Sequence, residues 1–183
     1  MEKSREATEG GIAKVLAAAE FAAFKHREQR RKGVRGSPYI NHPLAVASTL
    51  AQQAGVEDAD VLAAAILHDT IEDTTTPAGE LARAFGRPIA SIVAEVTDEK
   101  SQSKALRKRM QIAHAPHLSK QAKLVKLADK IVNLRDIVAR PPSWDLKRKQ
   151  EYFDWAKQVV DGLRGVHPVL EAEFDRVHAR RPR

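Results

Sequence analysis

The 183-residue chain contains no cysteine. This absence excludes disulfide bonds and thiolate metal ligands, so histidine and carboxylate side chains must hold any metal ion that the protein binds. A chain without cysteine fits a reducing compartment, and we expect a cytoplasmic protein.

Long apolar runs are missing as well. No stretch approaches the roughly 18 consecutive apolar residues of a membrane span. Lys14 and Glu20 interrupt the apolar segment near the N-terminus. We therefore expect neither a signal peptide nor a membrane partner.

Segments that alternate apolar and polar residues are few, whereas helical spacing recurs along the chain. The sequence shows no internal repeat and no low-complexity linker. It therefore predicts one all-α domain over residues 1–183, a bundle of eight or nine helices. The first predicted helix runs from Ile12 to about Arg31. The residues expected in its core are Leu16, Ala19, Ala23 and Phe24.

The net charge of +7 favours an anionic partner, either nucleic acid or a phosphate-rich small molecule. Many of the cations lie between Lys25 and Arg35, at the end of the first predicted helix. One interpretation is a solvated helix end, because the helix dipole favours cations there. The other is a set of cations that binds phosphate beside a metal site.

The segment from Val61 to Asp73 combines an almost wholly apolar helix with four ionisable residues at its end. A helix that is apolar on all sides is buried, and uncompensated charge at a buried end is costly. A metal ion held by the adjacent His68 and Asp69 would compensate that charge. Glu72 and Asp73 follow one helical turn later and could act on a water molecule. The alternative is a helix end where polar residues face solvent.

Two other segments offer further ligands. His42 precedes Pro43, which suits the first turn of a helix. In the predicted helix from Ser119 to Ala139, the apolar residues form one broad sector, and Asp129 and Asn133 lie along its border. A border position points into a cleft between helices, so Asp129 is a candidate metal ligand. The alternative is an exposed carboxylate on a charged helix.

Taken in chain order, the candidate metal ligands are His42, His68, Asp69 and Asp129. Two imidazoles and two carboxylates suit a divalent first-row ion with open coordination positions. This ordered set resembles the HD-domain metal phosphohydrolases. The surrounding sequence resembles the hydrolase domain of the RelA/SpoT family, and most closely its stand-alone hydrolases. The segments that carry this resemblance are 31–32, 39–43, 67–73 and 126–135.

The resemblance implies a manganese enzyme, with one Mn²⁺ per chain, that removes pyrophosphate from the 3′ position of guanosine tetra- or pentaphosphate. It implies that the manganese ligands are His42, His68, Asp69 and Asp129. It assigns the activation of water to Glu72 and Asp73. The nucleotide contacts that it implies are Arg31, Lys32, Tyr39, Lys104, Asn133, Arg148 and Tyr152.

One position departs from the family pattern. The long bifunctional members usually have Thr where this chain has Asp136. The resemblance therefore does not predict how the pocket selects the nucleoside. The resemblance covers only the hydrolase part of those members, so we expect no synthetase activity.

Two other functions stay open at this point. The same metal site could act on another ribose-phosphorylated nucleotide, such as an adenosine analogue or NADPH. A basic helical module could instead bind nucleic acid, without need of a metal and with a steep dependence on salt. The full set of ligands and acids argues against such a module, and we expect no nucleic-acid partner. The sequence leaves the oligomeric state undetermined.

Overall fold

The computed structural model describes residues 2–31 and 36–183, with side chains from residue 10 onward. The elements in chain order are α1 (Glu2–Lys25), α2 (Asn41–Ser48), the π-helical turn η1 (Thr49–Gln53), α3 (Ala59–Leu67), α4 (Thr70–Asp73), α5 (Ala78–Phe85), α6 (Arg87–Val96), α7 (Lys104–His114), the 3₁₀ turn η2 (Ala115–His117), α8 (Lys120–Ala139), α9 (Leu146–Asp161) and α10 (Pro168–His178). No β-strand occurs in the described residues, which confirms the predicted all-α bundle. Within the same residues, no helix is long and apolar enough to cross a membrane.

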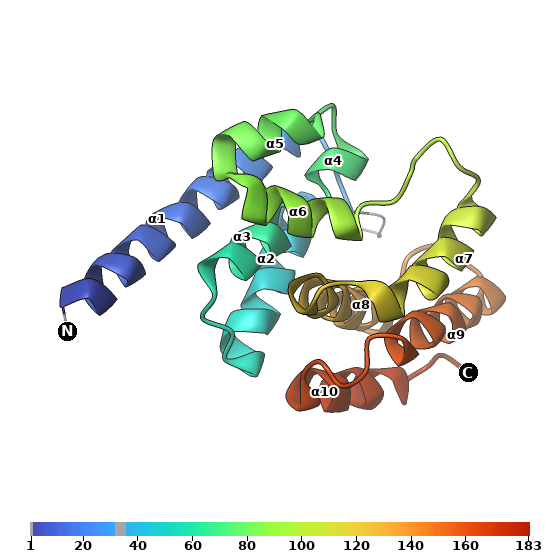
Figure 1. Cartoon of the computed structure of the whole chain (residues 1–183). Helices are drawn as coiled ribbons and strands as arrows, with labels where there is room; N and C mark the ends of the chain where they lie inside the picture. The colour runs from blue at the N-terminus through green and yellow to red at the C-terminus, as the bar shows by residue number, and fades with distance from the viewer. Residues whose placement is uncertain (1, 32–35) are drawn as a thin grey trace.

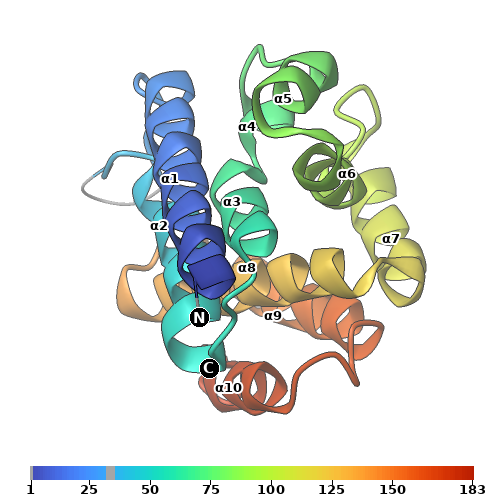
Figure 2. The same ribbon diagram turned by 60° about the vertical axis from the view of Figure 1, so that its left-hand side comes forward.

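The central element is α8. It contacts α2, α3 and α6 on one side and α9 and α10 on the other, as Figures 1 and 2 show. Ser119 caps its first turn by accepting a hydrogen bond from the Ala122 N–H, as the predicted start of this helix requires. Leu127, Ile131 and Leu134 are fully buried in the core. A helix surrounded in this way can carry polar side chains into the interior of the bundle.

The apolar helix predicted before His68 is α3. Asp58 caps it by accepting hydrogen bonds from the N–H groups of Asp60 and Val61. From Ala63 to Leu67 every residue is buried. The helix packs against α1, α2, α6 and α8, so its C-terminal end lies deep in the molecule.

The prediction for the first helix was wrong in both of its ends, because α1 begins at Glu2 and not at Ile12. It was also wrong in most of its core residues. α1 ends at Lys25, the side chains of Leu16 and Phe24 are 64% and 61% exposed, and Ala23 is exposed as well. The buried residues are Ala18 and Ala22. Apolar residues cover nearly the whole circumference of this helix, so the spacing alone could not select a face. The small alanines allow close packing against α3.

The segment after α1 turns back on itself. The Arg31 N–H donates to the Ser37 carbonyl at 2.9 Å, and the Tyr39 N–H donates to the Gln29 carbonyl at 3.0 Å. This pairing places Arg31 beside Tyr39, with the guanidinium carbon 5.6 Å from the centre of the tyrosine ring. Lys32, a predicted nucleotide contact, lies outside the described residues.

Candidate active site

The structure brings the four predicted metal ligands together from three parts of the chain. His42 lies in the first turn of α2, His68 and Asp69 lie between α3 and α4, and Asp129 lies on α8. His42 Nε2 is 3.1 Å from Asp129 Oδ1, and His68 Nε2 is 3.1 Å from Asp69 Oδ2. Both crosswise nitrogen–oxygen distances are 3.8 Å. Two imidazoles and two carboxylates therefore face one another in the core.

The tautomer of His68 supports a cation at this point. His68 Nδ1 lies 2.8 Å from the Ala65 carbonyl oxygen, which can only accept, so Nδ1 carries the proton. In the neutral ring, Nε2 then points a lone pair at the carboxylates of Asp69 and Asp129. Burial lowers the pKa of His68, but these two carboxylates outweigh it and raise the pKa to about 10. The position therefore requires either a proton or a metal ion, and the donor set fits a divalent ion.

The surroundings hold both carboxylates in their ionised form. Asn133 Nδ2 donates to Asp129 Oδ1 at 2.6 Å, and Lys130 Nζ donates to Asp129 Oδ2 at 3.0 Å. Burial acts to raise the pKa of Asp129, yet Lys130 and the two histidines lower it well below its ordinary value. Tyr39 donates its hydroxyl proton to Asp69 Oδ2 at 2.6 Å. One oxygen of each carboxylate thus faces the histidines.

From the sequence, we expected Glu72 and Asp73 to lie on the same helix as the apolar run before His68. In the structure they lie on a separate helical turn. α3 ends at Leu67 and a separate turn, α4, begins at Thr70, whose hydroxyl donates to the Leu67 carbonyl at 2.6 Å. The two acids of this turn face different basic partners, Glu72 facing Arg107 and Asp73 facing Lys100.

Glu72 lines the cavity that holds the four candidate ligands, which has a volume of about 140 Å³. Its Oε1 accepts from Arg107 Nη1 at 3.1 Å, and its Oε2 accepts from the Asp98 N–H at 3.2 Å. Burial raises the pKa of Glu72, and the negative charge of Asp98 adds to this effect. We call the cavity that holds the four candidate ligands the metal cavity. Asp73 instead lines a neighbouring cavity and binds Lys100 Nζ at 3.0 Å.

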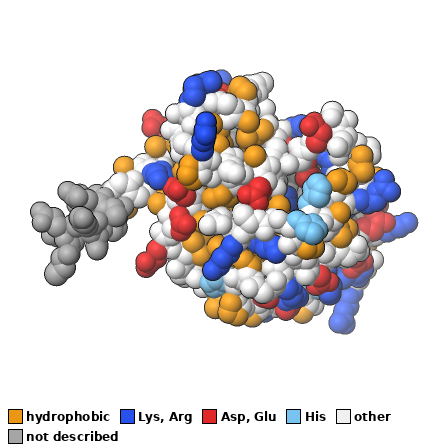
Figure 3. Space-filling model, viewed as in Figure 1, with side chains coloured by type: hydrophobic (Ala, Val, Ile, Leu, Met, Phe, Trp, Pro, Cys, Tyr) orange, Lys and Arg blue, Asp and Glu red, His pale blue; other side chains and the backbone are white. Residues whose placement is uncertain are grey.

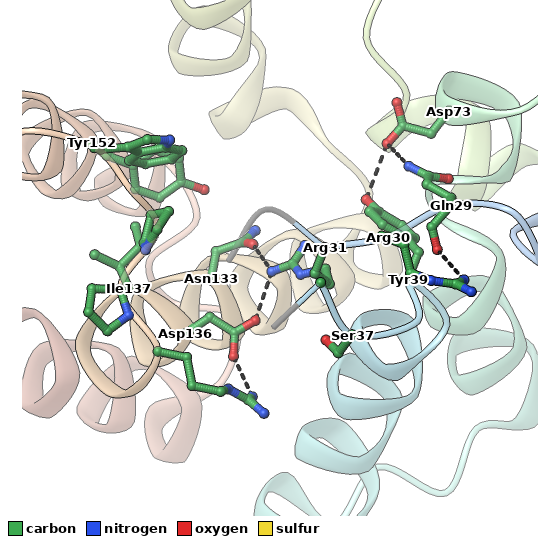
Figure 4. A pocket seen from close by; sticks show the side chains of 15 residues that line it. Gln29, Arg30, Arg31, Ser37, Tyr39, Asp73, Asn133, Asp136, Ile137 and Tyr152 are labelled. Carbon is green, nitrogen blue, oxygen red and sulfur yellow. Dashed lines mark hydrogen bonds and ion pairs between the residues drawn. The ribbon is translucent and has the colours of Figure 1, made fainter. Parts of the chain in front are cut away.

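The neighbouring cavity has a volume of about 660 Å³ and lies between the segment after α1, α8 and α9. We call it the large cavity. It shares Arg31, Tyr39 and Asn133 with the metal cavity. Arg31 Nη2 donates to Asn133 Oδ1 at 3.0 Å and to Asp136 Oδ2 at 2.8 Å, and Figure 4 shows it reaching across to these side chains on α8. The cavity is large enough for a nucleoside beside the metal cavity.

A third cavity, of about 540 Å³, lies between α7 and α9, and we call it the basic cavity. Figure 3 shows Lys and Arg side chains along the edge of the molecule where these helices lie. Its basic lining residues are Lys104, Arg107, Lys108, Lys147 and Arg148. Three acids, Asp98, Asp145 and Glu151, also line it, so the lining keeps a net positive charge.

The predicted nucleotide contacts therefore lie in two groups. Arg31, Tyr39 and Asn133 lie where the large and metal cavities meet. Lys104 and Arg148 line only the basic cavity among the cavities described. Tyr152 lines both the large and the basic cavity and connects the two groups.

Two residues of this region were missed from the sequence. Arg107 was not among the predicted contacts, but its side chain is only 25% exposed and binds Glu72. Lys130 is 3% exposed, and its ammonium lies 4.6 Å from the centre of the Trp155 ring. One signal was present for Lys130: it interrupts an apolar run on a buried helix, and a buried ammonium requires an acidic partner.

Comparison with known proteins agrees with this geometry. The family model described as an HD domain matches residues 18–154. The chain belongs to the HD-domain family. It is 54% identical over 162 residues to the guanosine-3′,5′-bis(diphosphate) 3′-pyrophosphohydrolase MESH1 of Xenopus tropicalis, covering 88% of this chain and 90% of that relative. The MESH1 of Danio rerio is 51% identical over 168 residues, covering 91% and 93%.

A solved structure gives the same result for the fold. It is described as a metazoan ortholog of SpoT that hydrolyzes ppGpp, and it superposes with a TM-score of 0.90 at 45% identity. The match covers 92% of this chain and 96% of that chain. Within the HD-domain family, the chain therefore belongs with the MESH1 proteins, which confirms the resemblance to stand-alone RelA/SpoT hydrolases.

Proposed function

We propose that this protein hydrolyses the 3′-pyrophosphate of guanosine tetra- and pentaphosphate, releasing pyrophosphate and GDP or GTP. The observation that carries the proposal is the convergence of His42, His68, Asp69 and Asp129 in a cavity that the acid Glu72 also lines. Support comes from the MESH1 relatives, which are named for this activity and align over most of their length.

Manganese is the metal that we propose for this site. His42, His68, Asp69 and Asp129 would hold it through the imidazole nitrogens and carboxylate oxygens that face one another. When bound, a divalent ion lowers the pKa of water and polarises a phosphoryl oxygen. The nitrogen and oxygen donor set also suits other first-row ions, so the choice of manganese rests on the family resemblance.

Glu72 is the residue we assign to the proton transfer. The pKa of Glu72 is raised, which brings it closer to neutral pH than the pKa of an exposed carboxylate, and a general base works best when its pKa lies near the operating pH. It accepts a proton from the attacking water, whose oxygen bonds to the phosphorus attached at the 3′ position. The bond from that phosphorus to the 3′ oxygen breaks, and the 3′ oxygen takes up a proton to become a hydroxyl. Asp73, linked through Tyr39 to Asp69, assists in orienting the reactants.

The substrate carries negative charge on both sides of its ribose, and the metal cavity can hold only one end. We assign the nucleoside to the large cavity, where Arg31, Tyr39 and Asn133 lie beside the ligands. The basic cavity, with Lys104 and Arg148, suits the 5′ phosphates, and Tyr152 lies between the two. Lys32 stays a predicted contact. The proposal covers hydrolysis in the cytoplasm and does not include synthesis of the tetraphosphate.

The test is product analysis by chromatography with a panel of nucleotides, using metal-stripped and manganese-loaded protein. The panel contains guanosine tetraphosphate, its adenosine analogue, NADPH and GTP. We expect GDP and pyrophosphate from the tetraphosphate, only with manganese, and little turnover of GTP. Preferred hydrolysis of NADPH or the adenosine analogue would change the proposed substrate, and no turnover of any of these nucleotides by the manganese-loaded protein would refute the proposed activity.

A further inference from the structure

Arg107 lies between two cavities that the proposed reaction uses separately. Its Nη1 donates to Glu72 Oε1 at 3.1 Å, and Glu72 lines the metal cavity. Arg107 itself lines the basic cavity, where the 5′ phosphates were placed. The two side chains are 25% and 20% exposed, so the pair is partly shielded from water.

The guanidinium has donors left for a second partner. Arginine carries five N–H donors in a planar fork, which suits the oxygens of carboxylates and phosphates. Among the described residues, only the bond to Glu72 is formed by the Arg107 side chain, and its Nε is buried without a hydrogen-bond partner. A phosphate in the basic cavity would supply acceptors for donors that are otherwise unsatisfied.

Among the residues that the structure describes, the Glu72 carboxylate has one hydrogen-bond donor besides Arg107. Its second oxygen accepts from the Asp98 N–H in the loop after α6. Arg107 comes from α7, whose first turn also supplies Lys104 to the basic cavity. The position of the acid is therefore set jointly by a loop and by a helix that lines the basic cavity.

We propose that Arg107 is a positioning residue that bridges the 5′ phosphates of the substrate to Glu72, so that binding of these phosphates orients the acid for catalysis. The inference rests on the proposed function and adds a basis for selectivity to it. Binding energy from a remote part of the substrate would be used to arrange the reacting groups. A nucleotide without 5′ phosphates would then lose kcat as well as affinity.

The experiment compares guanosine tetraphosphate with guanosine 3′-diphosphate, which keeps the cleaved group but lacks the 5′ phosphates. For wild-type protein we expect kcat to fall about 10²-fold on the shorter nucleotide, the loss typical of a misplaced catalytic group. Arg107→Gln should lower kcat on the tetraphosphate by a similar factor. On the shorter nucleotide, the variant and the wild type should have nearly equal kcat, because the bridge is absent in both.

Three further variants separate bridging from simple charge. Arg107→Lys keeps the charge but lacks the planar fork, so it should restore part of kcat. Lys147→Gln removes a cation of the same cavity that has no bond to Glu72, and should raise KM with kcat kept. Arg109→Gln makes the same substitution at an exposed position of α7 that lines none of the described cavities, and should match wild type. Thermal melting checks that each variant is folded. If Arg107→Gln does not fold, Arg107→Lys replaces it in the comparison of the two nucleotides.

Two outcomes would overturn the inference while the proposed function stands. Arg107→Gln could raise only KM on the tetraphosphate, which would make Arg107 a simple phosphate contact. It could instead lower kcat equally on both nucleotides, which would mean that it positions Glu72 without regard to the 5′ phosphates. Absence of tetraphosphate hydrolysis by the wild-type protein would overturn the proposed function itself.

Discussion

The metal cavity and the basic cavity are built in opposite ways. The first is small, about 140 Å³, and its ionisable groups are hydrogen-bonded to one another inside the core, where His42 is 3% and Asp129 8% exposed. The second is about 540 Å³, and its cations Lys104 and Arg148 come from exposed positions of α7 and α9. Buried, mutually bonded groups fix a geometry, whereas exposed cations supply charge that water and salt weaken. Substitutions in the two cavities should therefore differ in size and in kind.

The largest effect is expected from a change inside the metal cavity. Asp69→Asn keeps the shape of the side chain and an oxygen for the Tyr39 hydroxyl, but removes a charged ligand. We expect the folded variant to lose both the metal ion and detectable hydrolysis. Elemental analysis and chromatography measure the two. Asp154→Asn, at a surface acid paired with Arg181, is the control and should keep both. Full metal content with full activity in Asp69→Asn would contradict the ligand assignment.

The next effect separates chemistry from metal binding, with substitutions of Glu72 in the metal cavity and of Asp73 in the large cavity. Glu72→Gln should lower kcat by about 10²–10⁴-fold, the usual contribution of a general base, with the metal retained. Asp73→Asn should also lower kcat with the metal retained, and comparison of the two variants shows which acid carries the proton. A loss of only twofold in both would remove these acids from the chemical step.

Smaller effects are expected in the basic cavity. Lys104→Ala or Arg148→Ala should raise KM about twofold to fivefold, which corresponds to the energy of an exposed ion pair, up to about 1 kcal/mol. kcat should stay unchanged, because these cations bind ground state and transition state alike. Added salt should raise KM for the wild type more than for the variants. Steady-state kinetics at several salt concentrations measure this, and a salt-independent KM in the wild type would count against the basic cavity as a phosphate site.

The smallest effect concerns Asp136 at the rim of the large cavity. Burial acts to raise its pKa, but hydrogen bonds from Arg140 and Arg31 outweigh it, and the pKa lies below the ordinary value. The ionised carboxylate therefore stabilises the folded state above its unfolded pKa of about 3.9, and this stability is lost as pH falls through the folded pKa.

Asp136→Asn should consequently show a weaker loss of stability on acidification than the wild type. At neutral pH the free energy of unfolding should fall by no more than about 1 kcal/mol. Urea unfolding between pH 7 and pH 3 measures both quantities. Identical pH dependence in the two proteins would show that the ion pairs of Asp136 with Arg140 and Arg31 do not contribute.

The sequence predicted those parts of the molecule in which residue pattern and burial follow directly from one helix. The apolar run of α3 and the broad apolar sector of α8 could each be assigned without knowledge of their neighbours. Of the four candidate ligands, Asp129 lies on α8, His68 and Asp69 directly follow α3, and His42 lies in the first turn of α2. The structure brings them together, while their role as ligands stays a prediction.

Features that depend on packing between distant segments could not be predicted. Apolar side chains of α1 point in nearly all directions around the helix, so the pattern does not indicate which face is buried. Contact with α3 selects that face. The break between α3 and α4, stabilised by the bond from Thr70 to Leu67, interrupts a pattern that reads as one helix. The pairing of Arg107 with Glu72 joins two elements that are 35 residues apart in the chain. Spacing within one helix contains no information on such a pair.

Hydrolysis in ¹⁸O-labelled water tests the central claim most directly. Manganese-loaded protein is incubated with guanosine tetraphosphate in this water, the products are separated, and their masses are measured by mass spectrometry. Attack of water on the phosphorus at the 3′ position predicts one labelled oxygen in pyrophosphate and none in GDP. Label in the nucleotide, release of orthophosphate in place of pyrophosphate, or the same products without metal would contradict the proposed reaction at the metal cavity.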